Sequence, residues 1–103
     1  MLVGVPPVLD TGTLRLGGRT VRLAGVEPVG GEQARALSAH VGGREVACEP
    51  VLGEAYRCEV DGWDLSEVVP FNGGGRAGPG ATPAMLDAER AARAARKGIW
   101  GGR

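Results

Sequence analysis

Two cysteines and one histidine are the side chains of this chain best suited to covalent or metal chemistry. The histidine, His40, has no cysteine, aspartate or second histidine at the spacing of a metal site, so we interpret it as a surface or helix-end residue. If residues 52–54 form a turn, the flanking strands set Cys48 directly opposite Cys58. Opposed residues of an antiparallel pair have Cβ atoms about 4.5–5.5 Å apart, within reach of a disulfide. We therefore expect a Cys48–Cys58 disulfide, with two buried free thiols as the alternative.

Arginines of the expected strands are the side chains that could bind phosphate. They are Arg15, Arg19, Arg22 and Arg57. The 12 basic and 12 acidic residues leave no net charge, so the chain lacks the positive field of a nonspecific nucleic-acid binder. The aromatic side chains that could stack on bases are few, and we favour a packing role for Trp63. These features argue against nucleic-acid binding as the main role.

Strands must position these side chains, and residues 8–30 are expected to supply the central pair of strands. Polar and apolar residues alternate on either side of the Gly17–Gly18 turn, which predicts an antiparallel hairpin. Arg15 and Arg22 would lie on its outer face or rim. The inner face would place four side chains in the core, namely Leu14, Leu16, Val21 and Leu23.

The rest of the chain predicts one lead-in strand, a second hairpin and three helices. Residues 2–5 form an edge strand because Pro6 and Pro7 cannot donate to a ladder. A helix over residues 31–41 buries Ala34, Leu37, Ser38 and Val41, and the second hairpin spans residues 44–61. A helix over residues 63–69, with Asp64 as N-cap and Glu67 completing a capping box, is shortened or distorted by Pro70.

The C-terminal third begins with a glycine-rich stretch, residues 71–82, which we expect to be a flexible loop too rich in glycine to pack. The last helix follows, capped by Thr82 and stopped at Gly98. One face would carry Met85, Ala88, Ala92, Ala95 and Ile99 toward the core, with Trp100 filling a gap beyond it. On the opposite face, Arg90, Arg93 and Lys97 form a basic stripe. Glu89 can pair with Arg93, so we interpret this stripe as a solvated face.

Two motifs, VLDTGTLRLGGRTVRLAGV at residues 8–26 and ARAARKGIWG at residues 92–101, closely resemble those of the staphylococcal nuclease-like (thermonuclease) family. The resemblance spans roughly Val8 to Trp100. It implies a single domain, residues 1–103, of α+β class and mainly β structure. Its core would be a five-stranded OB-fold-like barrel with two or three packed helices. Active members of this family cleave phosphodiesters with a calcium ion.

The resemblance also implies which positions would carry that chemistry. Active members read D-G-D-T and then R-L-x-G-I-D-x-P-E around the first hairpin. Arg22 keeps the first phosphate-binding arginine, whereas one calcium aspartate falls on Gly12 and the proposed general base falls on Gly30. Glu27 replaces the second calcium aspartate, and Asp10 matches an additional carboxylate beside the metal, so these two are the candidate metal ligands.

The second phosphate arginine of the family lies in a loop that is cut short here. Either that arginine is deleted and Arg57 lies inside the strand, or Arg57 aligns with the loop, which leaves a strand too short to close the barrel. One arginine and one altered ligand do not support cleavage, since loss of a single transition-state donor commonly costs about 100-fold to 1,000-fold. We therefore expect a domain that has lost most catalytic residues and needs no cofactor.

Such a domain would serve as a binding or structural module for a protein partner. Two alternatives remain open, a weak calcium-dependent nuclease and a binder of nucleotides or single-stranded nucleic acid through Arg15, Arg22 and Arg57. Exported members of the family share such a disulfide. A disulfide here favours a periplasmic or secreted protein whose export segment is absent from this chain. Two free thiols would favour a cytoplasmic protein. We expect no membrane insertion because no apolar run approaches about 18 residues.

Overall fold

The expected first hairpin forms as β3 (Thr13–Leu16) and β4 (Arg19–Leu23) in the computed structural model, which describes residues 1–51 and 53–101. Thr13 pairs with Arg22 and Leu14 with Val21, so the two-residue period places alternate side chains on opposite faces. The four apolar side chains predicted for the inner face are all buried, while Arg15 and Arg22 are exposed. The prediction of this hairpin and of its core face is confirmed.

The second hairpin consists of β6 (Val46–Pro50) and β7 (Ala55–Val60). Its register pairs Cys48 with Cys58, both fully buried, and the two sulfur atoms form a disulfide. Both the register and the disulfide are therefore confirmed. Of the three residues expected in the turn, Leu52 lies outside the described residues, and Val51 N donates a hydrogen bond to Ala55 O across it.

Seven strands form one mixed sheet in the order β1–β6–β7–β4–β3–β2, with β8 (Trp63–Asp64) also paired to β7. The strands at the two ends are β1 (Leu2–Gly4) and β2 (Val8–Asp10), and the β4–β7 contact is parallel. A two-stranded sheet joins β5 (Val26–Glu27) to β9 (Arg76–Ala77). The α+β class is confirmed, whereas the ladders over residues 1–51 and 53–101 form no closed barrel, so the five-stranded barrel stays a prediction.

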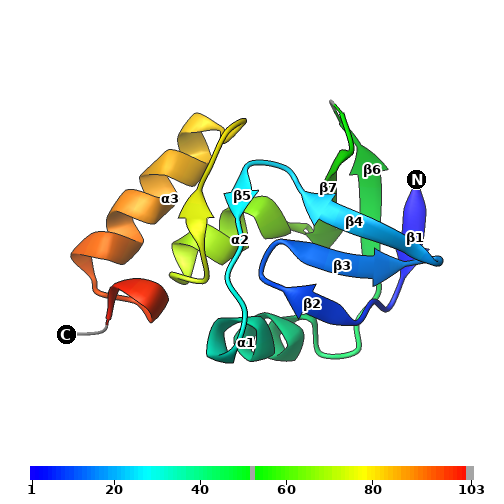
Figure 1. Cartoon of the computed structure of the whole chain (residues 1–103), viewed down its shortest axis with the longest axis horizontal. Coiled ribbons are helices and arrows are strands. Elements are labelled where there is room, and N and C mark those ends of the chain that lie inside the picture. The colour runs from blue at the N-terminus through cyan, green and yellow to red at the C-terminus, as the bar shows by residue number, and fades with distance from the viewer. Residues whose placement is uncertain (52, 102–103) are drawn as a thin grey trace.

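Three helices accompany the sheet, with α1 (Glu32–Val41) along one side and α2 (Leu65–Phe71) between the sheet and α3 (Pro83–Ala94) (Figure 1). Leu37 and Val41 of α1 are buried as expected, but Ser38 is exposed. Gly42 ends α1 in the left-handed conformation, its N–H donating to Ser38 O. Among the described residues, no helix combines the length and apolar composition that crossing a bilayer requires.

Helix α2 starts later and ends later than expected. Trp63 and Asp64 pair with β7, and Asp64 caps the helix by accepting a hydrogen bond from Ser66 N at 2.8 Å. The helix continues through Pro70 to Phe71, and with 7 residues it is short, as expected. Pro70 lies in the last turn, where it removes one intrahelical N–H donor. Leu65, Val68 and Val69 contribute to the core.

The glycine-rich segment of residues 71–82 is not the unpacked loop that we expected. Gly73, Gly74 and Gly75 are buried, and residues 76–77 form β9 against β5. A Cβ atom on Gly75 would lie 2.7 Å from the carbonyl oxygen of Glu27, so the backbone packs where a side chain would not fit. The expectation that this stretch is too rich in glycine to pack is therefore wrong for its first half.

Helix α3 begins as expected, with Thr82 Oγ1 accepting from Met85 N, but it ends at Ala94 rather than at Gly98. Arg96 adopts a left-handed φ of 55°, and Lys97 N donates to Ala92 O, which together form a Schellman motif. Of the expected apolar stripe, Met85 and Ala92 are buried but Ala95 is exposed, because the chain has already left the helix there. A 3₁₀ helix, η1 (Gly98–Trp100), follows.

Candidate functional site

The turn after β2 holds two of the family-derived positions, Asp10 and Gly12. Asp10 Oδ1 accepts a hydrogen bond from Gly12 N at 2.9 Å, so this carboxylate stabilises its own turn. Gly12 is buried, and a Cβ atom there would lie 2.9 Å from Pro28 Cβ. The position that would carry a calcium aspartate is therefore filled by a proline ring.

The neighbouring residue, Thr11, fixes this turn to the segment after β5. Its side chain is fully buried, its Oγ1 accepts from Val29 N at 2.8 Å, and its own N donates to Val29 O at 2.9 Å. Sequence reasoning missed this residue, because the bond joins two segments far apart in the sequence and has no local signal. It positions residues 28–30 beside the turn, and Gly30 faces open space with room for a side chain.

Glu27, the candidate metal ligand on β5, pairs with Arg76 of β9 at 3.7 Å, and both side chains are more than half exposed. A surface pair of this kind contributes little stability, about 0–1 kcal/mol. Among the residues that the structure describes, no group of three or more His, Cys, Asp or Glu side chains could hold a metal ion. Asp10 and Glu27 belong to no such group, and their role as metal ligands stays a prediction.

The two candidate phosphate arginines lie on adjacent strands and share a face of the sheet. Arg22 of β4 is paired with Ala55 of β7, and Arg57 follows two residues later on the same side. Arg22 and Arg15 are exposed. Arg57 already forms an ion pair, because its Nη1 lies 2.6 Å from Asp64 Oδ2. Each of these two side chains is two-thirds or more buried.

A hollow of about 300 Å³ lies beside Arg57, lined by residues 24–25 after β4, by residues 79–80 of the glycine-rich segment and by the start of β7. Arg57 is the one charged residue among the described residues that line it. The described lining of the hollow therefore offers a guanidinium, which Asp64 already binds, and no carboxylate.

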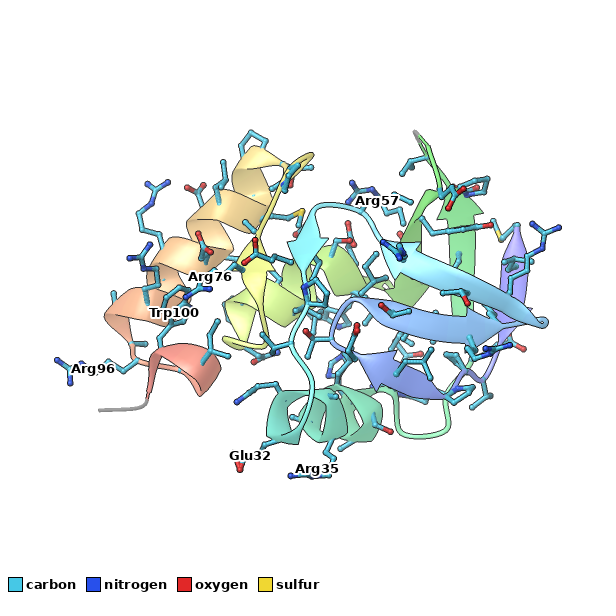
Figure 2. The ribbon with its side chains drawn as sticks, viewed as in Figure 1. Glu32, Arg35, Arg57, Arg76, Arg96 and Trp100 are labelled. Atoms are coloured by element: carbon cyan, nitrogen blue, oxygen red, sulfur yellow. A yellow bond between two sulfur atoms is a disulfide. The ribbon has the colours of Figure 1, made fainter. Side chains whose placement is uncertain are left out.

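The basic stripe of the last helix has different partners from those we expected. Glu89 accepts a hydrogen bond from Ala77 N at 3.1 Å rather than pairing with Arg93. Arg93 lies 4.7 Å from the ring centre of Trp100, and Arg76 lies 5.2 Å from it. Figure 2 shows Arg76 and Trp100 together between β9 and α3, well away from Arg57 on the sheet. Cation–π contacts thus attach η1 to the rest of the fold.

Comparison with models of protein families gave no match, and comparison with curated protein sequences gave no significant match. The staphylococcal nuclease-like resemblance therefore depends on the motifs of this sequence and on its element order.

Asp64 both caps the N-terminus of α2 and forms an ion pair with Arg57, so its replacement should lower the stability of the domain. Asp64→Ala removes both the helix cap and the ion pair and should lower the free energy of unfolding by about 2 kcal/mol. Asp64→Asn keeps an oxygen that can cap Ser66 N and should lose only about 1 kcal/mol. Urea unfolding of both variants measures the difference. Equal losses would show that the ion pair, not the cap, accounts for the effect.

Proposed function

We propose that this chain is a staphylococcal nuclease-like domain that has lost the family's cleavage chemistry and acts as a non-catalytic binding module for another protein. The sequence motifs and the order of the elements support the family. The state of the six positions that would carry the family's chemistry supports the loss of activity.

The observation that carries the proposal is the packing at position 12. Pro28 fills the space beside Gly12 that an aspartate would need, so a calcium ligand cannot simply be restored there. A glycine that had replaced an aspartate in an otherwise intact site would leave that space open. The region has instead packed around the missing side chain.

Three other charged candidates already have partners within the chain. Asp10 caps its turn, Glu27 faces Arg76, and Arg57 holds Asp64. Gly30, the position of the proposed base, has no side chain to activate water. Arg22 keeps the family's residue type and is exposed. One guanidinium without a metal and a base does not cleave phosphodiesters.

We also propose that the large sheet is a five-stranded OB-fold barrel whose first strand is interrupted. Its two end strands, β1 and β2, are consecutive in the chain and are separated only by residues 5–7. Taken as one strand interrupted at Pro6 and Pro7, they would pair with β6 on one side and β3 on the other and complete a circuit of five. The parallel β4–β7 pair fits this topology.

The Cys48–Cys58 disulfide supports an oxidising compartment, such as a periplasm or the cell exterior, as the place where this domain works. Partners of such a domain would be other exported proteins.

Calcium titration tests the loss of the metal site. A ligand that binds only the folded state stabilises it by RT ln(1 + [L]/Kd), so a millimolar site would add about 1.4 kcal/mol at ~10 mM calcium. We expect the Tm of the chelator-treated protein in calcium to equal its Tm in the same concentration of magnesium. A calcium-specific increase that Glu27→Gln removes would contradict the proposal.

A second candidate function, binding of nucleotides or single-stranded nucleic acid, is favoured by one observation. Arg22 and Arg57 share a face of the sheet, and Arg57 lines a hollow that has no carboxylate among its described lining residues. This function predicts binding of a labelled oligonucleotide that weakens steeply with salt and is reduced by Arg22→Ala.

A further inference from the structure

An open groove of about 440 Å³ lies between α2 and α3, and we call it the α2–α3 groove. Three alanines of α3 form part of its lining, and their small size leaves space between the two helices. The apolar residues that line the groove are Trp63, Val68, Phe71, Ala84, Ala88 and Ala91. This volume is at the lower end of the range for ligand clefts, about 300–1,000 Å³.

Two aromatic side chains of the groove are exposed. Trp63 is 65% exposed and Phe71 is 53% exposed, so the packing role that we favoured for Trp63 is wrong. Trp63 is held in place because β8 is paired with β7 immediately before α2 begins. Exposed tryptophans in rigid positions are the residues that most often dominate protein interfaces.

The charged residues that line the groove are all acidic, namely Asp64, Glu67 and Asp87, and none of the described lining residues is basic. Asp64 is neutralised by Arg57. Glu67 is exposed and forms no ion pair with the described residues. Asp87 lies 3.4 Å from Arg90, and this ion pair is weak because both side chains are three-quarters exposed. A carboxylate therefore stands on each helix, although the chain as a whole is neutral.

The Phe71 ring already accepts a cation, because Lys97 Nζ lies 4.6 Å from its centre. A lysine or arginine of a partner could approach Trp63 in the same way, with further attraction to Glu67 and Asp87.

We propose that the α2–α3 groove binds a cationic amphipathic segment of a partner protein. An apolar side chain of that segment lies against Trp63 and the part of the Phe71 ring that Lys97 leaves exposed. Its lysines or arginines face Glu67 and Asp87. This inference rests on the proposed binding role and names the surface and the chemistry of the partner.

A synthetic amphipathic peptide of leucines and lysines, fluorescently labelled, is the probe. Its binding to the full chain is followed by anisotropy, beside a peptide in which glutamates replace the lysines. We expect the lysine peptide alone to bind. Trp63→Ala should weaken binding by about 30-fold or more, as for an interface hot spot, and Glu67→Lys by about 10-fold.

Matched controls lie outside the groove. Val3→Ala removes an exposed apolar side chain from β1, and Glu45→Lys reverses an exposed charge before β6, so neither should change the affinity by more than about 2-fold. Equal weakening by Glu45→Lys and Glu67→Lys would overturn the proposal in favour of nonspecific attraction. Self-association of the chain that Trp63→Ala abolishes would overturn it in favour of a second copy as occupant.

The two proposals fail in different ways. Absence of peptide binding without any cleavage of single-stranded DNA would overturn the groove proposal alone. Calcium-dependent cleavage by a preparation that also binds the peptide through Trp63 would overturn the non-catalytic role and leave the groove standing.

Discussion

Gly98→Ala is expected to destabilise the domain by about 4 kcal/mol, a large part of the stability of a chain of this size. Gly98 has a φ of 52°, and a Cβ atom there would overlap the carbonyl group of Gly73. The two glycines bring η1 against the end of α2, where Ile99 N donates to Gly73 O at 2.8 Å. Because both sides of the contact are backbone, no side-chain movement can relieve the overlap. Urea unfolding measures the loss.

Gly17→Ala is the matched control. Gly17 has a φ of 59°, nearly that of Gly98, but no heavy atom lies within 4 Å of the position of its Cβ. Alanine at this site should cost only the left-handed strain, about 1 kcal/mol. If the two variants lose the same stability, the close approach of Gly73 and Gly98 does not contribute to the fold as described.

The second large effect is expected from the disulfide. Replacing Cys48 and Cys58 together by alanine should lower the free energy of unfolding by about 3 kcal/mol, since the bridge closes a short loop in the unfolded chain. Cys48→Ala alone should cost nearly as much, because either change removes the cross-link. Urea unfolding of the two variants and of the unmodified chain measures these losses.

Thiol titration provides the control for this prediction. The unmodified protein, unfolded in denaturant without reductant, should show no free thiol, and Cys48→Ala should show one. Two free thiols in the unmodified protein would contradict the disulfide and the oxidising compartment inferred from it.

The two hairpins could be predicted because their signals are local. Alternation over residues 13–23 sets which side chains of the first hairpin are buried, and the turn length of the second places Cys48 opposite Cys58. The N-caps Asp64 and Thr82 were also predictable, since a capping side chain bonds to a backbone N–H only two or three residues away.

The glycine-rich segment could not be predicted in the same way. Glycine is favoured in loose loops and also where two backbones meet closely, and the sequence of residues 73–75 is compatible with both. Only the position of β5 shows that two backbones meet closely here. The end of α3 was missed for a related reason, because the left-handed residue that stops it is Arg96 rather than a glycine.

For the candidate site, the sequence could indicate which residues to consider but not how they are arranged or what they contact. That Arg22 and Arg57 share a face follows from the parallel β4–β7 contact, which joins segments far apart in the sequence. The partners of Arg57 and Glu27, and the ring of Pro28 beside Gly12, are likewise tertiary contacts with no local signal. These contacts decide whether the charged groups are available for chemistry.

Cleavage of labelled single-stranded DNA in millimolar calcium tests the central claim most directly. The unmodified chain is compared with Gly30→Glu, which restores the proposed base at a position that has room for it, and with Arg22→Ala. We predict that all three remain folded and cleave no more DNA than the same reactions with a chelator. Cleavage by the unmodified chain that requires calcium and is lost in Arg22→Ala would contradict the claim and identify a working nuclease.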